Sequence, residues 1–184
     1  MKALIIDTTW ERAVLVLIDG DKTYPYVGES GARRHSPTVL AEADRLFTEA
    51  GLKPSDLDAV GAVVGPGSFT GIRIGVATAN AMAKATGAKI VEITELEAMI
   101  EGETEALALI DCKHDNYYAL KRAGGRDEYF AANIADIDEP GLKRVFFAGE
   151  ITDKLTSAFI RKYNAGEFVA EARPFYIKKS SAEA

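Results

Sequence analysis

The feature that most restricts the fold is a strand pattern that occurs twice, with the copies 104 residues apart. In the first copy, the apolar run of residues 4–6 ends at Asp7, and a second apolar run, a turn and a return strand follow. In the second copy, residues 107–110 end at Asp111, and the same succession follows. Short apolar runs bounded by turn residues predict buried strands. The repeat therefore indicates an α/β protein built from two lobes of related architecture.

The remaining segments complete an alternating order of strands and helices. Further strands are predicted at residues 13–18, 23–27, 59–64, 89–93, 117–121, 128–132 and 144–148. Helices are predicted at residues 36–50, 71–86, 95–100 and 152–162, where apolar spacing or capping residues favour them. Pro25 indicates an edge strand, and Ser36 before Pro37 is typical of a helix start. We expect an N-terminal lobe at residues 1–102 and a smaller C-terminal lobe at residues 103–184.

Composition limits the partners and the compartment. The net charge is −6, from 22 Lys and Arg and 28 Asp and Glu. A surface of that sign does not attract nucleic acid on its own, so any RNA contact is expected to need a partner. The single cysteine, Cys112, excludes an internal disulfide framework. The sequence contains no uninterrupted apolar run approaching about 18 residues and no signal-peptide pattern, and we interpret the chain as cytoplasmic.

The stretch VVGPGSFTGIRIG at residues 63–75 looks like a phosphate-binding loop but matches no established one. A Walker loop needs a Gly-Lys pair that is missing here, and a dinucleotide fingerprint needs a third glycine where Thr70 stands. A nucleophile elbow fails because Pro66 lies two residues before Ser68. Ser68 and Thr70 are good helix-capping residues, while free N–H groups at a helix start can bind an anion. A tight strand-to-helix turn and a weak anion contact both remain open.

The helix after this loop carries small residues at every fourth position. They are Gly71, Gly75, Ala79, Ala83 and Gly87. A glycine inside a helix costs about 0.5–1 kcal/mol relative to alanine, so something is expected to approach this face closely. The partner is either this protein's own sheet or other helix, or a helix of another subunit.

The candidates for catalytic chemistry are few. Asp7 and Asp111 end equivalent strands, as do the carboxylates that hold Mg²⁺ and phosphates in two-lobed ATPases, but neither is followed by glycine. The alternative is that each aspartate simply forms a turn. The only histidines are His35 and His114, and the residue four after His35 is Val39. A helical metal pair needs ligands four residues apart, so we expect no bound metal.

Four segments in order carry a family resemblance. They are IIDTT, GPGSFTGIRIG, LIDCKHDNYYA and RPFYIKK. Together they resemble the bacterial TsaB (YeaZ) family, the non-catalytic paralogues in tRNA threonylcarbamoyladenosine biosynthesis, over nearly the whole chain. The resemblance implies an actin-like ATPase or sugar-kinase-like (ribonuclease H-like) duplicated fold with two related lobes. This chain departs from the family pattern at Lys113 and Asn116, where arginine and glutamate are usual.

The resemblance also implies a function. Such proteins bind a catalytic paralogue that transfers threonylcarbamoyl to adenosine 37 of tRNAs reading ANN codons, and a P-loop ATPase subunit completes the assembly. We therefore expect no catalytic residue, a homodimer or heterodimer, indirect contact with tRNA and no membrane. We expect no stably bound cofactor and place any ATP or ADP contact at the partner interface. An independent actin-like ATPase or small-molecule kinase is the alternative, and a binding protein active as its own dimer is a third.

Two groups of residues are predicted as sites. The partner interface is predicted at Val39, Leu40, Ala43, Leu46, Phe47, Gly71, Ile72, Ile74, Gly75, Ala79 and Ala83. A weak nucleotide or anion contact is predicted at Asp7, Thr8, Thr9, Gly67, Ser68 and Asp111.

Overall fold

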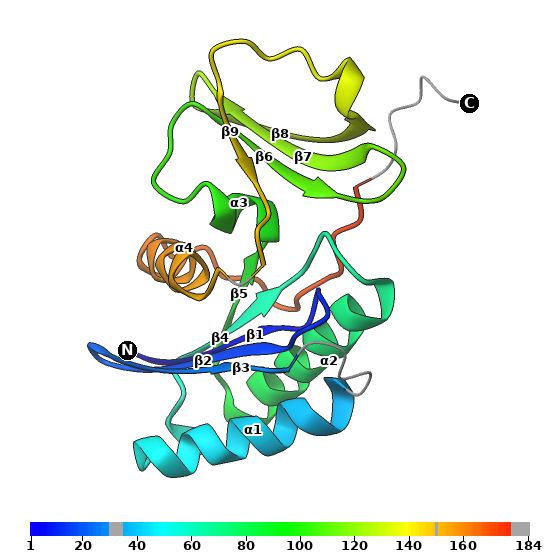
Figure 1. The fold of residues 1–184 in the computed structure, drawn as a ribbon. Coiled ribbons are helices and arrows are strands. Elements are labelled where there is room, and N and C mark those ends of the chain that lie inside the picture. Colours follow the sequence, from blue (N-terminus) through cyan, green and yellow to red (C-terminus); the bar gives the residue numbers. More distant parts are fainter. Residues whose placement is uncertain (30–34, 150, 178–184) are drawn as a thin grey trace.

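Two β-sheets form separate layers of the molecule, with two helices between them and two more on the far side of the first sheet (Figure 1). The structure is a computed structural model that describes residues 1–29, 35–149 and 151–177, with the backbone alone for residues 35–38. The first sheet has the strand order β3-β2-β1-β4-β5, and the second has the order β8-β7-β6-β9. Within the first sheet, β1 is antiparallel to β2 and parallel to β4. In the second, β6 is antiparallel to β7 and parallel to β9, so the predicted duplication is confirmed in topology.

The bounds of the elements follow the sequence patterns closely. The first sheet consists of β1 (Lys2–Asp7), β2 (Val14–Asp19), β3 (Lys22–Val27), β4 (Ala59–Val63) and β5 (Lys89–Ile93). The second consists of β6 (Ala106–Asp111), β7 (Asn116–Ala123), β8 (Arg126–Asn133) and β9 (Lys143–Phe146). The helices are α1 (His35–Ala50), α2 (Phe69–Thr86), α3 (Glu95–Met99) and α4 (Thr152–Asn164), with 3₁₀ turns η1 (Pro54–Asp56) and η2 (Ile134–Asp136).

Most sequence predictions of single elements are confirmed, with small shifts at the ends. Pro25 lies in β3, the edge strand of its sheet, as predicted. The α2 helix begins two residues before the predicted start because Ser68, rather than a later residue, is its N-cap. The β9 strand ends at Phe146 instead of residue 148. The predicted cap at Ser36 lies outside the described side chains.

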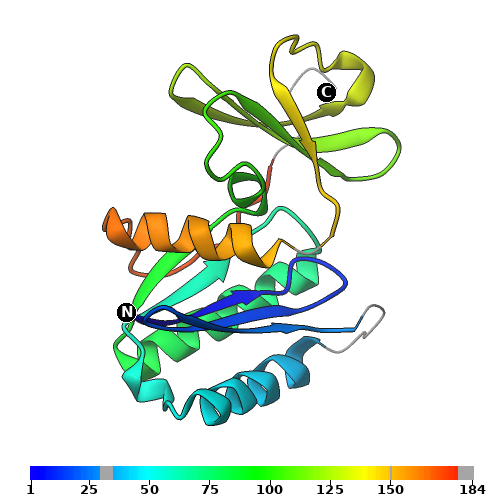
Figure 2. The ribbon, with the colours of Figure 1, turned by 60° about the vertical axis from the view of Figure 1, so that its left-hand side comes forward.

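The first sheet is covered on both faces, which explains its continuous apolar strands. Alternate residues of β1 point to opposite sides. Leu4 and Ile6 pack with α1 and α2, whereas Ala3 and Ile5 pack with α4 (Figures 1 and 2). Each helical layer therefore buries its own set of alternate residues of β1, β2, β4 and β5.

The α4 helix departs from the predicted boundary at residue 102. Although it follows the second sheet in sequence, its buried residues Leu155, Ala158 and Phe159 pack on the first sheet. A Cβ atom at Gly61 would lie 2.8 Å from Phe159 Cδ2, so the glycine in β4 makes room for that ring. The chain thus returns to the first lobe after completing the second.

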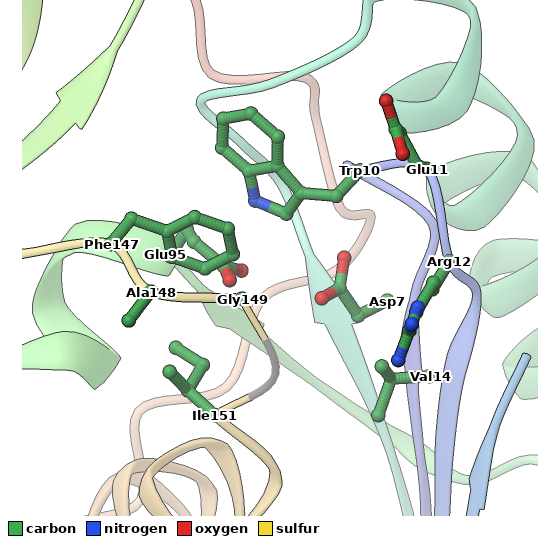
Figure 3. A pocket seen from close by; sticks show the side chains of 10 residues that line it. All are labelled: Asp7, Trp10, Glu11, Arg12, Val14, Glu95, Phe147, Ala148, Gly149 and Ile151. Atoms are coloured by element: carbon green, nitrogen blue, oxygen red, sulfur yellow. The ribbon is translucent and has the colours of Figure 1, made fainter. Parts of the chain in front are cut away.

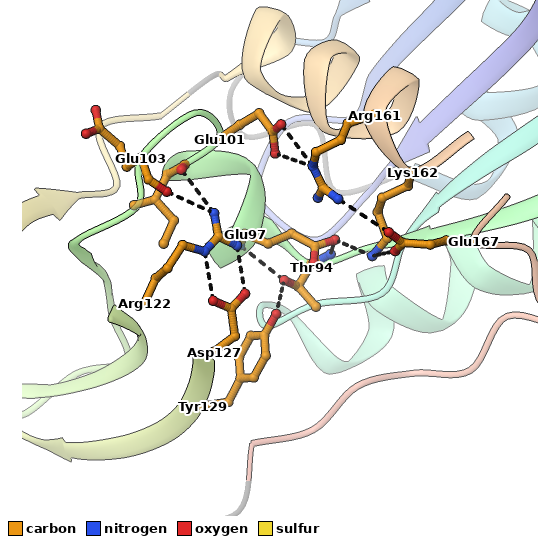
Figure 4. A network of polar contacts seen from close by, with 11 residues as sticks. Thr94, Glu97, Glu101, Glu103, Arg122, Asp127, Tyr129, Arg161, Lys162 and Glu167 are labelled. Carbon is orange, nitrogen blue, oxygen red and sulfur yellow. Dashed lines mark hydrogen bonds and ion pairs between the residues drawn. The ribbon is translucent and has the colours of Figure 1, made fainter. Parts of the chain in front are cut away.

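A polar network fixes the second sheet to the helices below it (Figure 4). The guanidinium of Arg122 in β7 donates two hydrogen bonds of 2.7 Å to the Asp127 carboxylate, and it also reaches the carbonyl of Ile100 at 3.3 Å. Two further contacts continue the network: the hydroxyls of Tyr129 and Thr94 lie 3.1 Å apart, and Lys162 donates to Glu97 at 2.8 Å. The β7–β8 hairpin, α3 and α4 are thereby held together.

Candidate functional site

The residues predicted for partner contact lie mainly inside the protein. Among the eleven, all but Leu40 and Ile74 are buried, and they pack between α1, α2 and the first sheet. The chain's own residues pack on the small-residue face, and contact of these helices with another subunit stays a prediction.

Two of the small residues of α2, Gly71 and Gly75, make room for Thr8, the residue that follows β1. A Cβ atom at Gly75 would lie 2.5 Å from Thr8 Oγ1, and one at Gly71 would overlap the Thr8 carbonyl oxygen. Thr8 Oγ1 also donates a 2.7 Å hydrogen bond to the carbonyl of Gly71. Of the two partners that the sequence left open for this helix face, the structure shows the protein's own sheet.

The glycine-rich loop before α2 is likewise packed against the backbone that follows β1. The Ser68 amide donates to the Thr9 carbonyl at 2.7 Å, and the Ser68 hydroxyl accepts from the Gly71 amide at 3.3 Å. A Cβ atom at Gly67 would overlap the Thr9 carbonyl oxygen. Thr8, Thr9, Gly67 and Ser68 therefore form a packed junction between a strand end and a helix start, and a weak nucleotide or anion contact at these residues stays a prediction.

The two predicted aspartates have different surroundings. Asp7 is buried and lines a cavity in the first lobe, whereas Asp111 is exposed and does not line that cavity. Asp111 Oδ1 accepts a 2.7 Å hydrogen bond from the Lys113 amide, which makes it a turn former. The structure thus agrees with the turn alternative for Asp111 and separates it from Asp7.

The cavity beside Asp7 has a volume of about 400 Å³. Figure 3 shows that it lies between the β1–β2 loop, the first residue of α3 and the segment that leads from β9 to α4. Its lining residues are Asp7, Trp10, Glu11, Arg12, Val14, Glu95, Phe147, Ala148, Gly149 and Ile151.

Two buried carboxyl groups, from Asp7 and Glu95, meet in this cavity. Asp7 Oδ1 accepts hydrogen bonds from the Thr9 amide at 2.8 Å and the Thr9 hydroxyl at 2.7 Å. Glu95 is only 1% exposed, and its burial, followed by the charge of Asp7, raises its pKa well above the ordinary value. Burial and the neighbouring carboxylate therefore both favour the protonated form of Glu95.

An aromatic pair closes one side of the cavity. The rings of Trp10 and Phe147 stack with centroids 4.7 Å apart at an angle of 24°. Trp10 Nε1 and Glu95 Oε2 are both buried, and the Trp10 indole lies close enough to the Glu95 carboxyl group to oppose the rise of its pKa.

Sequence reasoning missed Glu95 because a local signal gave it another explanation. Thr94 and Glu97 form a capping box, in which Glu97 donates its amide to Thr94 Oγ1 at 3.1 Å. Acidic residues are common in the first turn of a helix, so the sequence alone gives no reason to single out Glu95. Only the folded structure shows that the Glu95 carboxyl group is buried beside that of Asp7.

Comparison with known proteins identifies the family. The family model described as tRNA N6-adenosine threonylcarbamoyltransferase, TsaD, matches residues 7–171. The tRNA threonylcarbamoyladenosine biosynthesis protein TsaB of Haemophilus influenzae is 31% identical over 91% of this chain, and its Escherichia coli counterpart is 32% identical over 64%. The chain belongs to the TsaB (YeaZ) family.

Solved structures support the fold of this TsaB-family chain. YeaZ from Pseudomonas aeruginosa superposes with a TM-score of 0.77 at 20% identity, covering 96% of this chain and 99% of that one. A second Pseudomonas aeruginosa structure, of an uncharacterized protein similar to peptidase YEAZ, gives a TM-score of 0.79 with the same coverage. Together with the duplicated sheet topology, these matches confirm the predicted actin-like fold with two related lobes.

The sequence likeness extends to the TsaD enzymes over part of their length. The tRNA N6-adenosine threonylcarbamoyltransferase of Erythrobacter litoralis is 34% identical over 55% of this chain and 29% of that enzyme. The TsaB-family chain spans 61% and 53% of the two curated TsaB relatives.

Neither a metal cluster nor a membrane segment is found in the described part of this TsaB-family chain. Residues 1–29, 35–149 and 151–177 contain no group of three or more His, Cys, Asp or Glu side chains placed to hold a metal ion. Within the same residues, no helix is both long and apolar enough to span a bilayer.

Proposed function

We propose that this chain is a non-catalytic subunit that dimerises with a TsaD-type paralogue and supports threonylcarbamoyl transfer to adenosine 37 of tRNAs reading ANN codons. Family membership supports the pathway. A P-loop ATPase subunit as second partner, a homodimer as alternative assembly and ATP or ADP at the partner interface belong to the same proposal. Because the net charge is −6, tRNA contact is assigned to the partners.

The observation that carries the non-catalytic assignment lies on α1. A helical metal pair needs its second ligand four residues after the first. The position four after His35 is Val39, which is fully buried in the core between α1 and the first sheet. An apolar side chain at that depth is a packing residue, so α1 carries no such pair.

The surface proposed for the partner is the outer side of α1 and α2. Both helices cover the same face of the first sheet, opposite α4 (Figure 2). Leu40 on α1 and Phe69 at the start of α2 are 59% and 57% exposed and give this side two large apolar contacts for a partner. Ala77 and Ala81 are exposed on α2, so another helix can approach closely at these two positions.

Co-purification tests this proposal. The TsaD-type paralogue of the same organism is expected to retain the wild-type chain and to lose Leu40→Arg, because an arginine cannot be buried unpaired in the interface. The matched control is Ile160→Arg, which places the same charge on an exposed apolar residue of α4, on the opposite side of the sheet. Equal retention of both variants, with unchanged melting temperatures, would contradict the interface.

An activity measurement separates the proposal from the kinase alternative. The complex is expected to modify tRNA in the presence of threonine, bicarbonate and ATP, and omission of this chain is expected to abolish or strongly reduce the product. Turnover of Mg-ATP by the isolated chain would instead favour an independent ATPase or kinase.

A further inference from the structure

The segment that follows α4 returns to the start of α2 and forms an exposed cluster there. We propose that this arginine–aromatic cluster, made of Phe69, Arg73 and Tyr176, is the anchor of the contact with the TsaD-type paralogue. It fits a partner surface that offers an apolar pocket bordered by a carboxylate. The inference rests on the proposed function, and it adds residues 165–177 to the two helices that form the proposed contact.

Three contacts hold the arginine–aromatic cluster together. The rings of Phe69 and Tyr176 stack with centroids 5.6 Å apart at an interplanar angle of 25°. Arg73 Cζ lies 4.0 Å from the centroid of the Phe69 ring, and Arg73 Nε donates a 3.3 Å hydrogen bond to the Tyr176 hydroxyl. Each side chain is therefore positioned by the other two, so less conformational entropy is lost when a partner binds.

The backbone before Tyr176 is fixed to α2 and to the first sheet. The Asn80 side chain of α2 accepts a hydrogen bond from the Ala172 amide at 2.8 Å and donates one to the Ala172 carbonyl at 2.9 Å. The Phe175 amide donates to the Val64 carbonyl at 2.8 Å. These bonds place Tyr176 at the start of α2 independently of its own side chain.

Mutual packing leaves much of the arginine–aromatic cluster uncovered. Phe69 is 57% exposed and Tyr176 is 47% exposed, although their rings stack on each other. Apolar surface left in water adds nothing to folding stability, whereas tyrosine and arginine are enriched at the centres of protein interfaces. Leu40 lies in the first half of α1, and α1 and α2 begin on the same side of the first sheet (Figures 1 and 2). The cluster therefore lies at the same end of the helix pair as Leu40.

The charge of α2 indicates the chemistry of the partner. This helix contains Arg73 and Lys84 but no acidic residue, although the whole chain has a net charge of −6. Within the described part of the chain, Arg73 forms no ion pair, and Nε is its only nitrogen in a hydrogen bond. The two terminal nitrogens of its guanidinium can therefore bind both oxygens of one carboxylate. We expect an acidic side chain of the paralogue opposite Arg73.

The affinity of the full chain for the TsaD-type paralogue, measured by isothermal titration calorimetry, tests the anchor. Tyr176→Ala and Phe69→Ala are each expected to weaken binding at least about 10-fold, as truncation of an interface anchor does. The matched control is Phe146→Ala, because Phe146 is 49% exposed and also contacts a tyrosine ring, that of Tyr117 in the second sheet. This control is expected to change the affinity less than about 2-fold.

The charge of Arg73 is tested separately. Arg73→Glu is expected to weaken binding at least about 10-fold, and Arg73→Gln to make the affinity less dependent on salt, because salt screens a pair of opposite charges. Arg126→Glu, on the exposed part of β8, makes the same charge change away from the contact and should leave the affinity unchanged. Melting curves confirm folding, and the variants of Phe69 and Arg73 decide the test if Tyr176→Ala does not fold.

The possible outcomes separate the anchor from the proposed function. Affinities of Tyr176→Ala and Phe69→Ala equal to that of the control, with binding still lost in Leu40→Arg, would overturn the anchor and leave the proposed function intact. Absence of binding by the wild type would overturn both. Unchanged affinity for the paralogue combined with weaker binding of tRNA by the complex would assign the cluster to RNA bases. Loss of self-association alone would assign it to a second copy of the chain, and either result would overturn the inference.

Discussion

Replacing Gly75 with alanine tests whether α2 is shaped by Thr8 or by another subunit. In the middle of an exposed helix, this change would stabilise the protein by about 0.5–1 kcal/mol, because alanine is the better helix former. Here the added Cβ atom would lie 2.5 Å from Thr8 Oγ1, closer than real contacts allow. Overpacking of this kind costs about 1–3 kcal/mol, so we expect a net loss of about 1–2 kcal/mol.

The effect should depend on Thr8. Thr8→Ala removes Oγ1 and with it the 2.7 Å hydrogen bond to Gly71, at an expected cost of about 1 kcal/mol. In that background the methyl group at position 75 meets only ordinary van der Waals neighbours, Thr8 Cβ at 3.7 Å and Ile6 Cγ2 at 3.8 Å, and Gly75→Ala should be neutral or stabilising. The coupling energy of the double-mutant cycle is therefore expected to be about 1–3 kcal/mol in favour of the double variant.

Urea denaturation followed by circular dichroism measures all four proteins of the cycle. Ala77→Gly, on the exposed side of the same helix, calibrates the helix-propensity contribution and should cost about 0.5–1 kcal/mol. The reasoning is refuted if Gly75→Ala stabilises the chain by the propensity difference alone, or if Thr8→Ala leaves its effect unchanged. A loss of partner binding without a loss of stability would support the inter-subunit contact instead.

Three further predictions concern packing and pH. Gly61→Ala in β4 should destabilise the protein by about 1–3 kcal/mol in urea denaturation, because its methyl group meets the Phe159 ring, and Phe159→Leu should reduce that penalty. Burial, followed by the charge of Glu97, raises the pKa of Tyr129 to about 12. The contribution of the Tyr129 hydroxyl to the free energy of unfolding is therefore complete below pH 10 and is lost as the pH rises toward 12. The complete loss amounts to about 2–3 kcal/mol, of which about half is reached at pH 11, so denaturation at pH 8 and pH 11 should show a loss of about 1–1.5 kcal/mol in the wild type that is missing in Tyr129→Phe. Because the pKa of Glu95 is raised in the folded state, its contribution to stability is complete below about pH 4.5 and declines as the pH rises through the folded-state pKa. Glu95→Gln should therefore make the free energy of unfolding less dependent on pH above about pH 5. An unchanged pH dependence in this variant would contradict the buried position of the carboxyl group.

The sequence predicted the helices and strands better than it predicted which residues pack against them. The strand pattern around Asp7 and Asp111 is local, because apolar runs and turn residues lie next to each other in the chain, and both sheets were predicted from it. The glycines of α2 showed that something comes close, but a missing side chain does not say what fills its place. Thr8 was identified only when β1 and α2 were seen together.

Contacts between distant segments explain the remaining differences. The pairing of Asp7 with Glu95 joins two residues whose local sequences each suggest an ordinary turn or cap. The position of α4 depends on the chain crossing back after β9, which its own amphipathic pattern does not reveal. Helix amphipathicity predicts that a face is buried but does not identify the sheet that buries it.

The return of α4 to the first sheet has a consequence for synthesis on the ribosome. All five strands of that sheet have been made once Ile93 has emerged, yet the side of the sheet that receives Phe159 stays uncovered for a further 66 residues. During that interval the nascent chain presents an apolar surface to its surroundings, which is the situation in which chaperones bind and incomplete chains aggregate. A product truncated between the two lobes is therefore expected to be recovered from cells in inclusion bodies.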